Sequence, residues 1–307
     1  MSEKFLIVTP KYGLCNQIIT ISKGIIFAII TKRNIIFNSF QMDFKNEDNI
    51  CNFEDVIDID VINNILKEKN ININIYSNNI IPNKDLINKI YIGSNEDISK
   101  FTDFTDFFNL LSIPINYNEI YLDIENPVYV SIPNEYFELY YYIIINIKFV
   151  NKYIKISNII KEKINLKNYI SVHLRLEDDS IHYLKKNLDF NTVNELYKKM
   201  YINELDNICK LNKQIYVSTS LEIFDNFNNN FYKEIKEKYN LLDKNDIVEL
   251  SDCREICAII DYIISNDSDE FIGSDWSSFS LLINNKHINN NKPSKLIDIY
   301  KTLTDMY

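Results

Sequence analysis

A histidine and an arginine stand two residues apart at the end of a short apolar run, YISVHLRLEDDS, residues 169–180. Side chains two apart on a strand share a face, so His173 and Arg175 would emerge together at the carboxyl end of a strand over 169–174. Open α/β sheets bind ligands beyond that end. The planar guanidinium of an arginine there suits a pyrophosphate, because it stays charged and donates two parallel hydrogen bonds.

The acids that follow Arg175 leave several roles open. Asp178 could orient the guanidinium or accept a hydrogen bond from a ligand hydroxyl, and Glu177, Asp178 and Asp179 are all candidates for a general base. A structural alternative also stays open, in which Arg175 only pairs with these acids and His173 is a satisfied core histidine.

A second candidate is EFIGSDWSSFS, residues 270–280. Gly273 is expected to allow a tight turn after a strand, and the serines that follow lead into a helix. The free N–H groups and the positive dipole end of a helix N-terminus bind anions, with the Ser277 and Ser278 hydroxyls as further donors. The alternative is that a serine merely caps the helix.

A third candidate is YGLCNQ, residues 12–17, where Gly13 turns the chain after the first strand and Asn16 could reach across an interdomain cleft. A glycine turn that opens a helix serves packing more often than chemistry, so this motif is weak when taken alone.

Strands that alternate with helices predict an α/β protein with mostly parallel sheets and helices on both faces. We expect helical segments within 53–68, 101–111 and 134–165. The expected strands are 4–10, 34–38, 169–174, 214–218, 247–250 and 269–273, and the other expected helices are 18–33, 190–211, 221–239, 253–265 and 276–285.

The length of 307 residues favours two domains. We place them at 1–165 and 166–307, each Rossmann-like, with a hinge near 150–168. Residues 40–135 are polar and Asn-rich, and we expect them to be irregular and to line the acceptor side of the first domain.

A formal net charge of −10 argues against a nucleic-acid-binding surface, so a few placed groups must meet any phosphate. The five cysteines are odd in number and scattered, and they form neither a disulfide framework nor a zinc pattern. The N-terminal MSEKFLIVTP enters a strand directly, and the longest apolar runs are too short to span a bilayer. We therefore expect an intracellular, cytoplasmic protein without membrane insertion, or one that a partner delivers to its membrane.

Four peptides in this order and spacing resemble the fucosyltransferase superfamily, which includes the protein O-fucosyltransferases and the alpha-1,6 and alpha-1,2 enzymes. They are GLCNQ, VHLRLED, YVSTS (216–220) and FIGSDWSSFS. The resemblance implies a GT-B fold with two Rossmann-like domains facing a cleft. It also implies an inverting glycosyltransferase that moves fucose from GDP-fucose to a hydroxyl of a glycan or protein. No metal or other cofactor is expected, and Asp58-Ile59-Asp60 is interpreted as loop acid.

The resemblance also assigns residues to roles. Arg175 would grip the pyrophosphate and stabilise charge on the departing GDP, with support from His173 and Asp178. Ser277, Ser278 and Phe279 would wrap the phosphates, and Gly13 and Asn16 would contact the donor from the N-terminal side.

Two departures from the family pattern bear on function. Ser218-Thr219-Ser220 stands where relatives often carry an acid. Ser218 and Ser220 are expected to contact the nucleobase. Because neither is an acid, the prediction of guanine as the base is less secure than the prediction of a diphosphate. The S-S-F-S tail lacks the tryptophans of the alpha-1,2 group and favours the O-fucosyl or alpha-1,6 side. Two alternatives stay open: a protein that binds a nucleotide sugar or glycan without turnover, and a transferase that uses another nucleotide sugar.

Overall fold

The computed structural model forms two compact units, unit 1 (residues 1–150) and unit 2 (residues 151–307). The boundary expected at 165 and 166 differs from this division by helix α6 (Asn151–Lys163), whose Ile160 packs with Ile260 and Ile264 of unit 2. The structure describes residues 4–43, 46, 48–77, 87–90, 121–125, 132–177, 181, 189–219, 228–246 and 253–299. The helix expected at 101–111 and the strand expected at 247–250 lie outside these residues.

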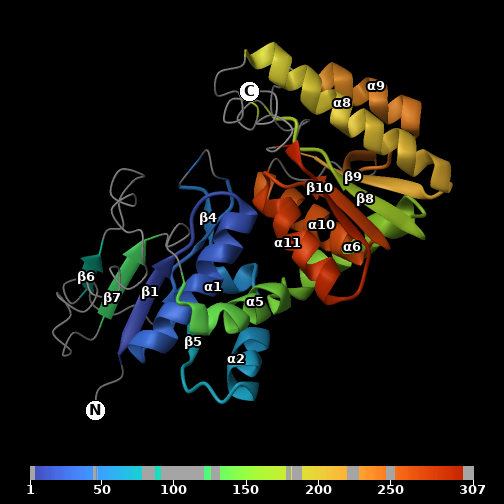
Figure 1. Cartoon of the computed structure of the whole chain (residues 1–307). Coiled ribbons are helices and arrows are strands. Elements are labelled where there is room, and N and C mark those ends of the chain that lie inside the picture. The colour runs from blue at the N-terminus through green and yellow to red at the C-terminus, as the bar shows by residue number, and fades with distance from the viewer. Residues whose placement is uncertain are drawn as a thin grey trace. The chain divides into compact units, whose positions relative to one another are not determined.

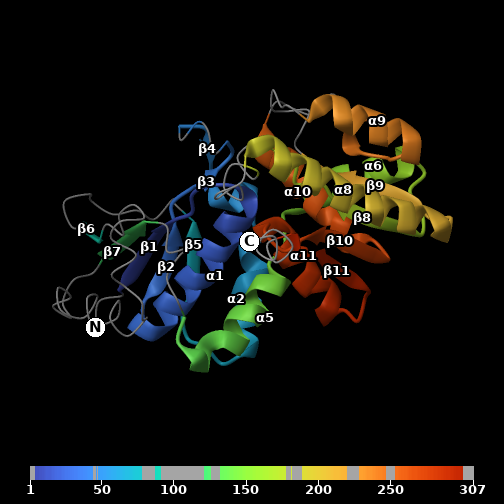
Figure 2. The same cartoon turned by 45° about the horizontal axis from the view of Figure 1, so that its top comes forward.

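Unit 1 is built on a parallel five-stranded sheet in the order β5-β2-β1-β7-β6, which can be followed in Figure 2. The strands are β1 (Phe5–Thr9), β2 (Asn34–Phe37), β5 (Ile75–Ser77), β6 (Ile87–Ile90) and β7 (Tyr121–Glu125). β1 and β2 confirm the predicted opening. The expectation that 40–135 is irregular was wrong for β5, β6 and β7, because β7 pairs directly with β1 in the middle of the sheet.

The described residues of unit 1 form the α-helices α1 (Leu14–Thr31), α2 (Ile59–Glu68) and α5 (Phe137–Asn146). Side chains of β1 point alternately to the two faces of the sheet. Val8 faces α1, where a Cβ added to Gly24 would lie 3.1 Å from it. Phe5 and Ile7 face the other side and pack with Ile36 and Tyr76. By length and composition α1 could cross a membrane, but 67% of its apolar window is buried inside the fold. Here α1 is a core helix, as its spacing predicts.

The described part of unit 1 also contains short elements. They are the antiparallel pair β3 (Phe40–Gln41) and β4 (Ile50–Cys51), and the single turns η1 (Phe53–Asp55) and η5 (Asn134–Tyr136). The Asp58 carboxylate caps α2 by accepting from the Val61 N–H at 3.2 Å, so this acid is a helix cap and not a loop acid. The helix expected over 134–165 is broken where Phe149 pairs with Ile57.

Unit 2 contains a parallel four-stranded sheet in the order β11-β10-β8-β9. Its strands are β8 (Tyr169–His173), β9 (Gln214–Ser218), β10 (Glu270–Ser274) and β11 (Ser294–Ile297). β8, β9 and β10 are the predicted strands. β11 was missed, because its short run SKLI has only two apolar residues.

Helices cover both faces of this sheet, as Figure 1 shows. Apolar residues of α8 (Phe190–Ile208) and α9 (Asn229–Tyr239) form one core with the strands. On the opposite face lie α6, α10 (Arg254–Asp267) and α11 (Ser278–Asn289). Two single turns, η6 (Cys209–Leu211) and η7 (Lys244–Asp246), follow α8 and α9. The predicted three-layer α/β arrangement is confirmed for this unit.

Gly273 is needed for close packing and not for a tight turn. It lies inside β10, and no described glycine has a positive φ. A Cβ at this position would lie 2.4 Å from the Ser280 Oγ and 2.8 Å from the Phe271 ring. The missing side chain therefore lets the first turn of α11 rest directly on β10.

We expect Gly273→Ala to lower the free energy of unfolding by about 1–3 kcal/mol, because Ser280 and Phe271 must both move. Gly24→Ala is the matched control, since its Cβ would meet only side-chain methyl groups, at 3.1–3.3 Å, and alanine favours a helix. Urea unfolding followed by circular dichroism measures both. Equal losses in the two variants would contradict the role of Gly273.

Candidate active site

The two candidate motifs of unit 2 meet at one edge of the sheet. β8 pairs in parallel with β9, with His173 opposite Ser218, and β10 pairs in parallel with β8 on its other side. Parallel neighbours end at the same edge, so VHLR and GSDWSSFS leave the sheet side by side. The expectation that both motifs end strands of one sheet is therefore confirmed.

His173 joins β8 to the first turn of α11. Its Nδ1 lies 2.8 Å from the Ser280 Oγ, and its ring lies 4.6 Å from the Phe279 ring. The Ser280 Oγ also accepts the Ser274 N–H at 3.0 Å, so one hydroxyl links the imidazole on β8 to the backbone at the end of β10.

The electrostatic setting of His173 keeps its imidazole neutral. The side chain is 6% exposed, and burial lowers its pKa to about 3, with smaller contributions from the charges of Arg175 and Lys244. His173 is therefore a fixed, uncharged hydrogen-bonding group at neutral pH. The site carries its positive charge on other residues.

Arg175 is held at the sheet edge by the residues around it. Leu174 and Leu176 on either side are fully buried, whereas the Arg175 side chain is 22% exposed. The Leu174 N–H donates to the Ser218 carbonyl at 3.0 Å, and the Arg175 N–H donates to the Tyr201 hydroxyl at 3.1 Å. This anchoring gives the guanidinium a fixed starting point at the carboxyl end of β8.

Glu177 pairs with Arg175, with 3.3 Å between Oε1 and Nη1. The Glu177 side chain is 7% exposed. The carboxylate therefore contacts the arginine from inside the protein. This ion pair was the structural alternative for Arg175, and it coexists with partial exposure of the guanidinium. Asp178 lies outside the described residues.

The N-terminus of α11 is capped by Ser277, whose Oγ accepts from the Ser280 N–H at 3.5 Å. Ser277 is buried, and Ser278 and Phe279 are half-buried. The Phe279 ring also packs edge-on against Tyr262 at 5.9 Å. The capping alternative is thus true of Ser277, while the first-turn N–H groups of Ser278 and Phe279 lack carbonyl partners within the helix.

Ser218 does not present its hydroxyl to a ligand. It is 1% exposed, and its Oγ lies 2.7 Å from the Ser265 Oγ, which also lies 2.7 Å from the Ser171 Oγ. These hydroxyls join β8 and β9 to α10 inside the protein. The predicted ligand contact of Ser218 is therefore replaced by a structural one, and Ser220 lies outside the described residues.

A buried polar cluster behind β9 was not predicted. The Lys244 ammonium lies 2.8 Å from the Asp261 Oδ2, and the Tyr216 hydroxyl donates to the Asp261 Oδ1 at 2.7 Å. Burial raises the pKa of Asp261, although Lys244 opposes this. Lys244 stands in the polar stretch LLDKND, where nothing in the sequence distinguishes it from a surface lysine.

In unit 1, two glutamines hold the loop after β1. The Gln17 Nε2 donates to the Tyr12 and Gln41 carbonyls, both at 2.8 Å, and the Gln17 Oε1 accepts from the Gln41 N–H at 2.9 Å. Tyr12 takes the positive φ of 72°, whereas Gly13 has an extended φ of −63° and caps α1. Asn16 is half-buried on the first turn of α1. The sequence pointed to Gly13 and Asn16 but not to the glutamines.

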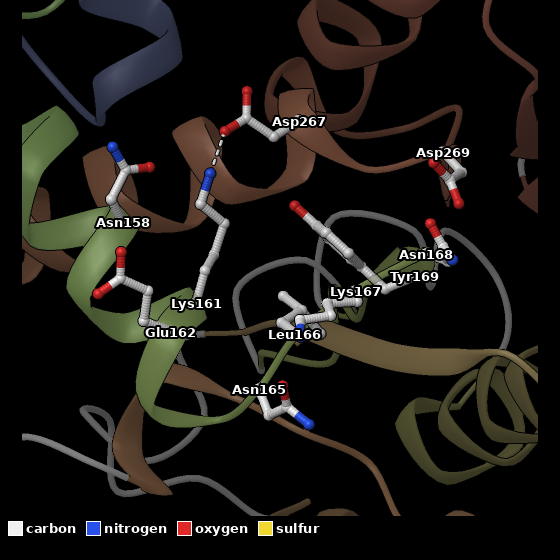
Figure 3. A pocket seen from close by; sticks show the side chains of 10 residues that line it. All are labelled: Asn158, Lys161, Glu162, Asn165, Leu166, Lys167, Asn168, Tyr169, Asp267 and Asp269. Atoms are coloured by element: carbon white, nitrogen blue, oxygen red, sulfur yellow. Dashed lines mark hydrogen bonds and ion pairs between the residues drawn. The ribbon is translucent and has the colours of Figure 1, made fainter.

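Among the described residues, no group of three or more His, Cys, Asp and Glu side chains is placed to hold a metal ion. A pocket of about 480 Å³ lies at the other edge of the unit 2 sheet, next to the start of β8 at Tyr169. Figure 3 shows that Lys161 and Asp267 pair with each other in it. It is lined by Asn158, Lys161, Glu162, Asn165, Leu166, Lys167, Asn168, Tyr169, Asp267 and Asp269, so it shares no residue with the candidate site.

A family model matches the part of the chain that contains the candidate residues of unit 2. The model described as GDP-fucose protein O-fucosyltransferase matches residues 136–288, about half of the chain. The matched segment runs from the end of η5 into α11 and includes every described candidate residue of unit 2. No curated protein matches the chain by sequence.

Solved structures share the fold over almost the whole chain. POFUT1 in complex with GDP has a TM-score of 0.67 at 12% identity, covering 96% of this chain and 99% of that chain. The alpha-1,6-fucosyltransferase NodZ soaked with GDP-fucose has a TM-score of 0.59 at 12% identity, covering 92% of each chain. A further structure, of NodZ from Bradyrhizobium, has a TM-score of 0.56 at 13% identity, with the same coverage of 92%. These likenesses confirm the GT-B-type fold.

The low pKa of His173 predicts a pH dependence of stability. The folded-state pKa of about 3 lies below the unfolded value near 6.5, so the stabilisation is complete above about pH 6.5 and is lost as the pH falls. Between pH 7 and pH 5 the parent should lose about 2 kcal/mol more unfolding free energy than His173→Gln. Urea unfolding at both pH values tests this. A ring that titrates between pH 5 and 8 in NMR spectra would contradict it.

Proposed function

The chain belongs to the GDP-fucose-dependent fucosyltransferase superfamily, and from this membership we propose that unit 2 binds the GDP-fucose donor at the carboxyl edge of its sheet. The transferase moves the fucosyl group to a hydroxyl of a glycan or protein, with inversion at the anomeric carbon. The solved relatives named with GDP or GDP-fucose support the choice of donor.

One observation carries the proposal: a guanidinium and a helix N-terminus lie at neighbouring strand ends and are joined through His173 and Ser280. Arg175 follows β8, and α11 follows β10. A diphosphate needs several donors within a few ångströms of one another, and this edge supplies a bidentate cation, first-turn N–H groups and a neutral imidazole. The same residues placed on separate elements would not form such a site.

The proposed reaction is a direct displacement. The acceptor oxygen forms a bond to C1 of fucose while the bond from C1 to the β-phosphate oxygen breaks, and the electron pair leaves with GDP. The acceptor proton passes to a base. Negative charge therefore grows on the β-phosphate, where Arg175 and the N–H groups of Ser278 and Phe279 would each stabilise it by a few kcal/mol.

The ion pair between Arg175 and Glu177 favours an orienting role for Glu177. A carboxylate that is 7% exposed and turned toward the arginine is poorly placed to take a proton from an acceptor that arrives from solvent. Asp178 and Asp179, next along the chain, are then the better candidates for the base. Glu177 orients the Arg175 guanidinium and offsets part of its positive charge.

For unit 1 we propose the acceptor side and a secondary contact with the donor through Gly13 and Asn16. The glutamine pair Gln17 and Gln41 supports this proposal, because it holds the β1 loop in one conformation. β1 also lies where the strand order reverses, since β2 leads away on one side and β7 on the other. Such switch points are the usual ligand sites of parallel sheets.

We expect Arg175→Ala to lower kcat/KM for GDP release from GDP-fucose by about 100-fold or more, because the growing phosphate charge loses its cation. Arg175→Lys should recover only part of the rate, since an ammonium cannot donate the paired hydrogen bonds. The assay uses a panel of glycan and peptide acceptors. EDTA should leave the rate unchanged if the site works without a metal.

The control is Lys198→Ala, which removes a partly buried cation that pairs with the exposed Glu195 on α8. Competition binding of GDP, UDP and dTDP tests the choice of nucleotide. GDP binding without turnover on any acceptor would identify a binding protein and refute transfer. Preference for UDP or dTDP would refute GDP-fucose as the donor.

A further inference from the structure

Lys244 is a lysine with 0% exposure that reaches the same sheet edge as the candidate site. The segment before it runs beside β9, since Leu242 pairs in parallel with Tyr216. The Leu242 N–H donates to the Ile215 carbonyl at 2.9 Å, and the Val217 N–H donates to the Leu242 carbonyl at 2.7 Å. Because the pairing is parallel, the chain leaves it in the direction of β9. Lys244 therefore follows a further strand-like segment at the carboxyl edge.

The Lys244 ammonium makes two contacts that differ in kind. It lies 2.8 Å from the Asp261 Oδ2 on α10, and it donates to the Thr219 carbonyl at 2.9 Å. Thr219 is the first residue after β9 and is 4% exposed. Asp261 is held from the other side by the hydroxyl of Tyr216. Lys244 thus ties the end of β9 to a carboxylate that α10 and β9 hold in place.

Stability alone is a weak reason for this arrangement. Removing two charges from water costs several kcal/mol per ion, and apolar residues of similar volume often stabilise a core as well or better. The ammonium is placed toward the ligand edge, and its charge contributes to the low pKa of His173. The charge of Lys244 therefore acts on His173 in the candidate site.

We propose that Lys244 is a positioning residue of the donor site, whose ammonium fixes the Thr219 carbonyl and the end of β9 beside the diphosphate. This inference rests on the proposed function. Lys244 touches no donor atom in this scheme. It acts through the backbone at the end of β9, and through the Ser218 carbonyl that holds the Leu174 N–H.

The test compares two variants that each remove one partner of the same buried pair. Lys244→Met removes the hydrogen bond to Thr219, whereas Asp261→Asn leaves it in place. Both should lower the melting temperature, because each leaves a buried charge without its partner. In GDP titrations by calorimetry, Lys244→Met should weaken Kd by at least about tenfold, and Asp261→Asn by less than about threefold. Equal weakening in both variants, or none in Lys244→Met, would overturn the proposal.

Hydrogen exchange at the Leu174 amide gives a readout that needs no ligand. This amide donates to the Ser218 carbonyl, so it should exchange faster in Lys244→Met than in Asp261→Asn. Should the parent fail to bind GDP, the proposed donor is wrong, and equal exchange in the two variants would still refute the role of Lys244. Lys244→Gln, whose amide can still donate to Thr219, replaces Lys244→Met if the latter does not fold. In Lys244→Gln the Leu174 amide should exchange as slowly as in the parent, and faster exchange of this amide would refute the proposal.

Discussion

The contact between the Ser280 hydroxyl and the His173 ring is the constraint on which the candidate site depends. It forms because Gly273 has no side chain, so that α11 can begin directly on β10. The Ser274 N–H donates to the same hydroxyl and closes the turn between β10 and α11. The position of the helix N-terminus relative to the end of β8 is thus set by a few short contacts. Two separate anion-binding features become one site through them.

Buried polar groups hold the rest of the edge. The hydroxyls of Ser171, Ser218 and Ser265 link β8 and β9 to α10, and the pair of Lys244 and Asp261 links the end of β9 to the same helix. Polar groups in a core are costly unless each one is matched, so such networks specify one arrangement strongly. The strands supply the fold of unit 2, and these matched groups fix where its strand ends lie.

The sequence predicted what depends on local pattern. The alternation around His173 and Arg175 identified β8 and its carboxyl end, and the order of strands and helices predicted parallel sheets. Gly273 was predicted to allow a tight turn, but it is needed because Ser280 of α11 approaches it closely. This contact is tertiary, and rules for turns consider only residues that are neighbours in the sequence. Gln17 and Lys244 were missed for a related reason. A buried polar side chain looks like a surface one until its tertiary partners are known. The strands β5, β6 and β7 were missed because their runs IYS, INKI and YLDIE are too short for a clear period-two pattern.

The charge of the chain explains why these local devices are needed. At a formal net charge of −10 the protein as a whole repels a phosphate donor. At physiological ionic strength salt largely screens this repulsion beyond about 8 Å. Binding must therefore arise from groups in direct contact. Arg175 and Lys244 each have a carboxylate partner, which fixes their positions but offsets part of their charge. The first-turn N–H groups of α11 and the neutral His173 ring carry no counter-charge. In an acidic protein, uncharged donors held in place can contribute as much to an anion site as its cations.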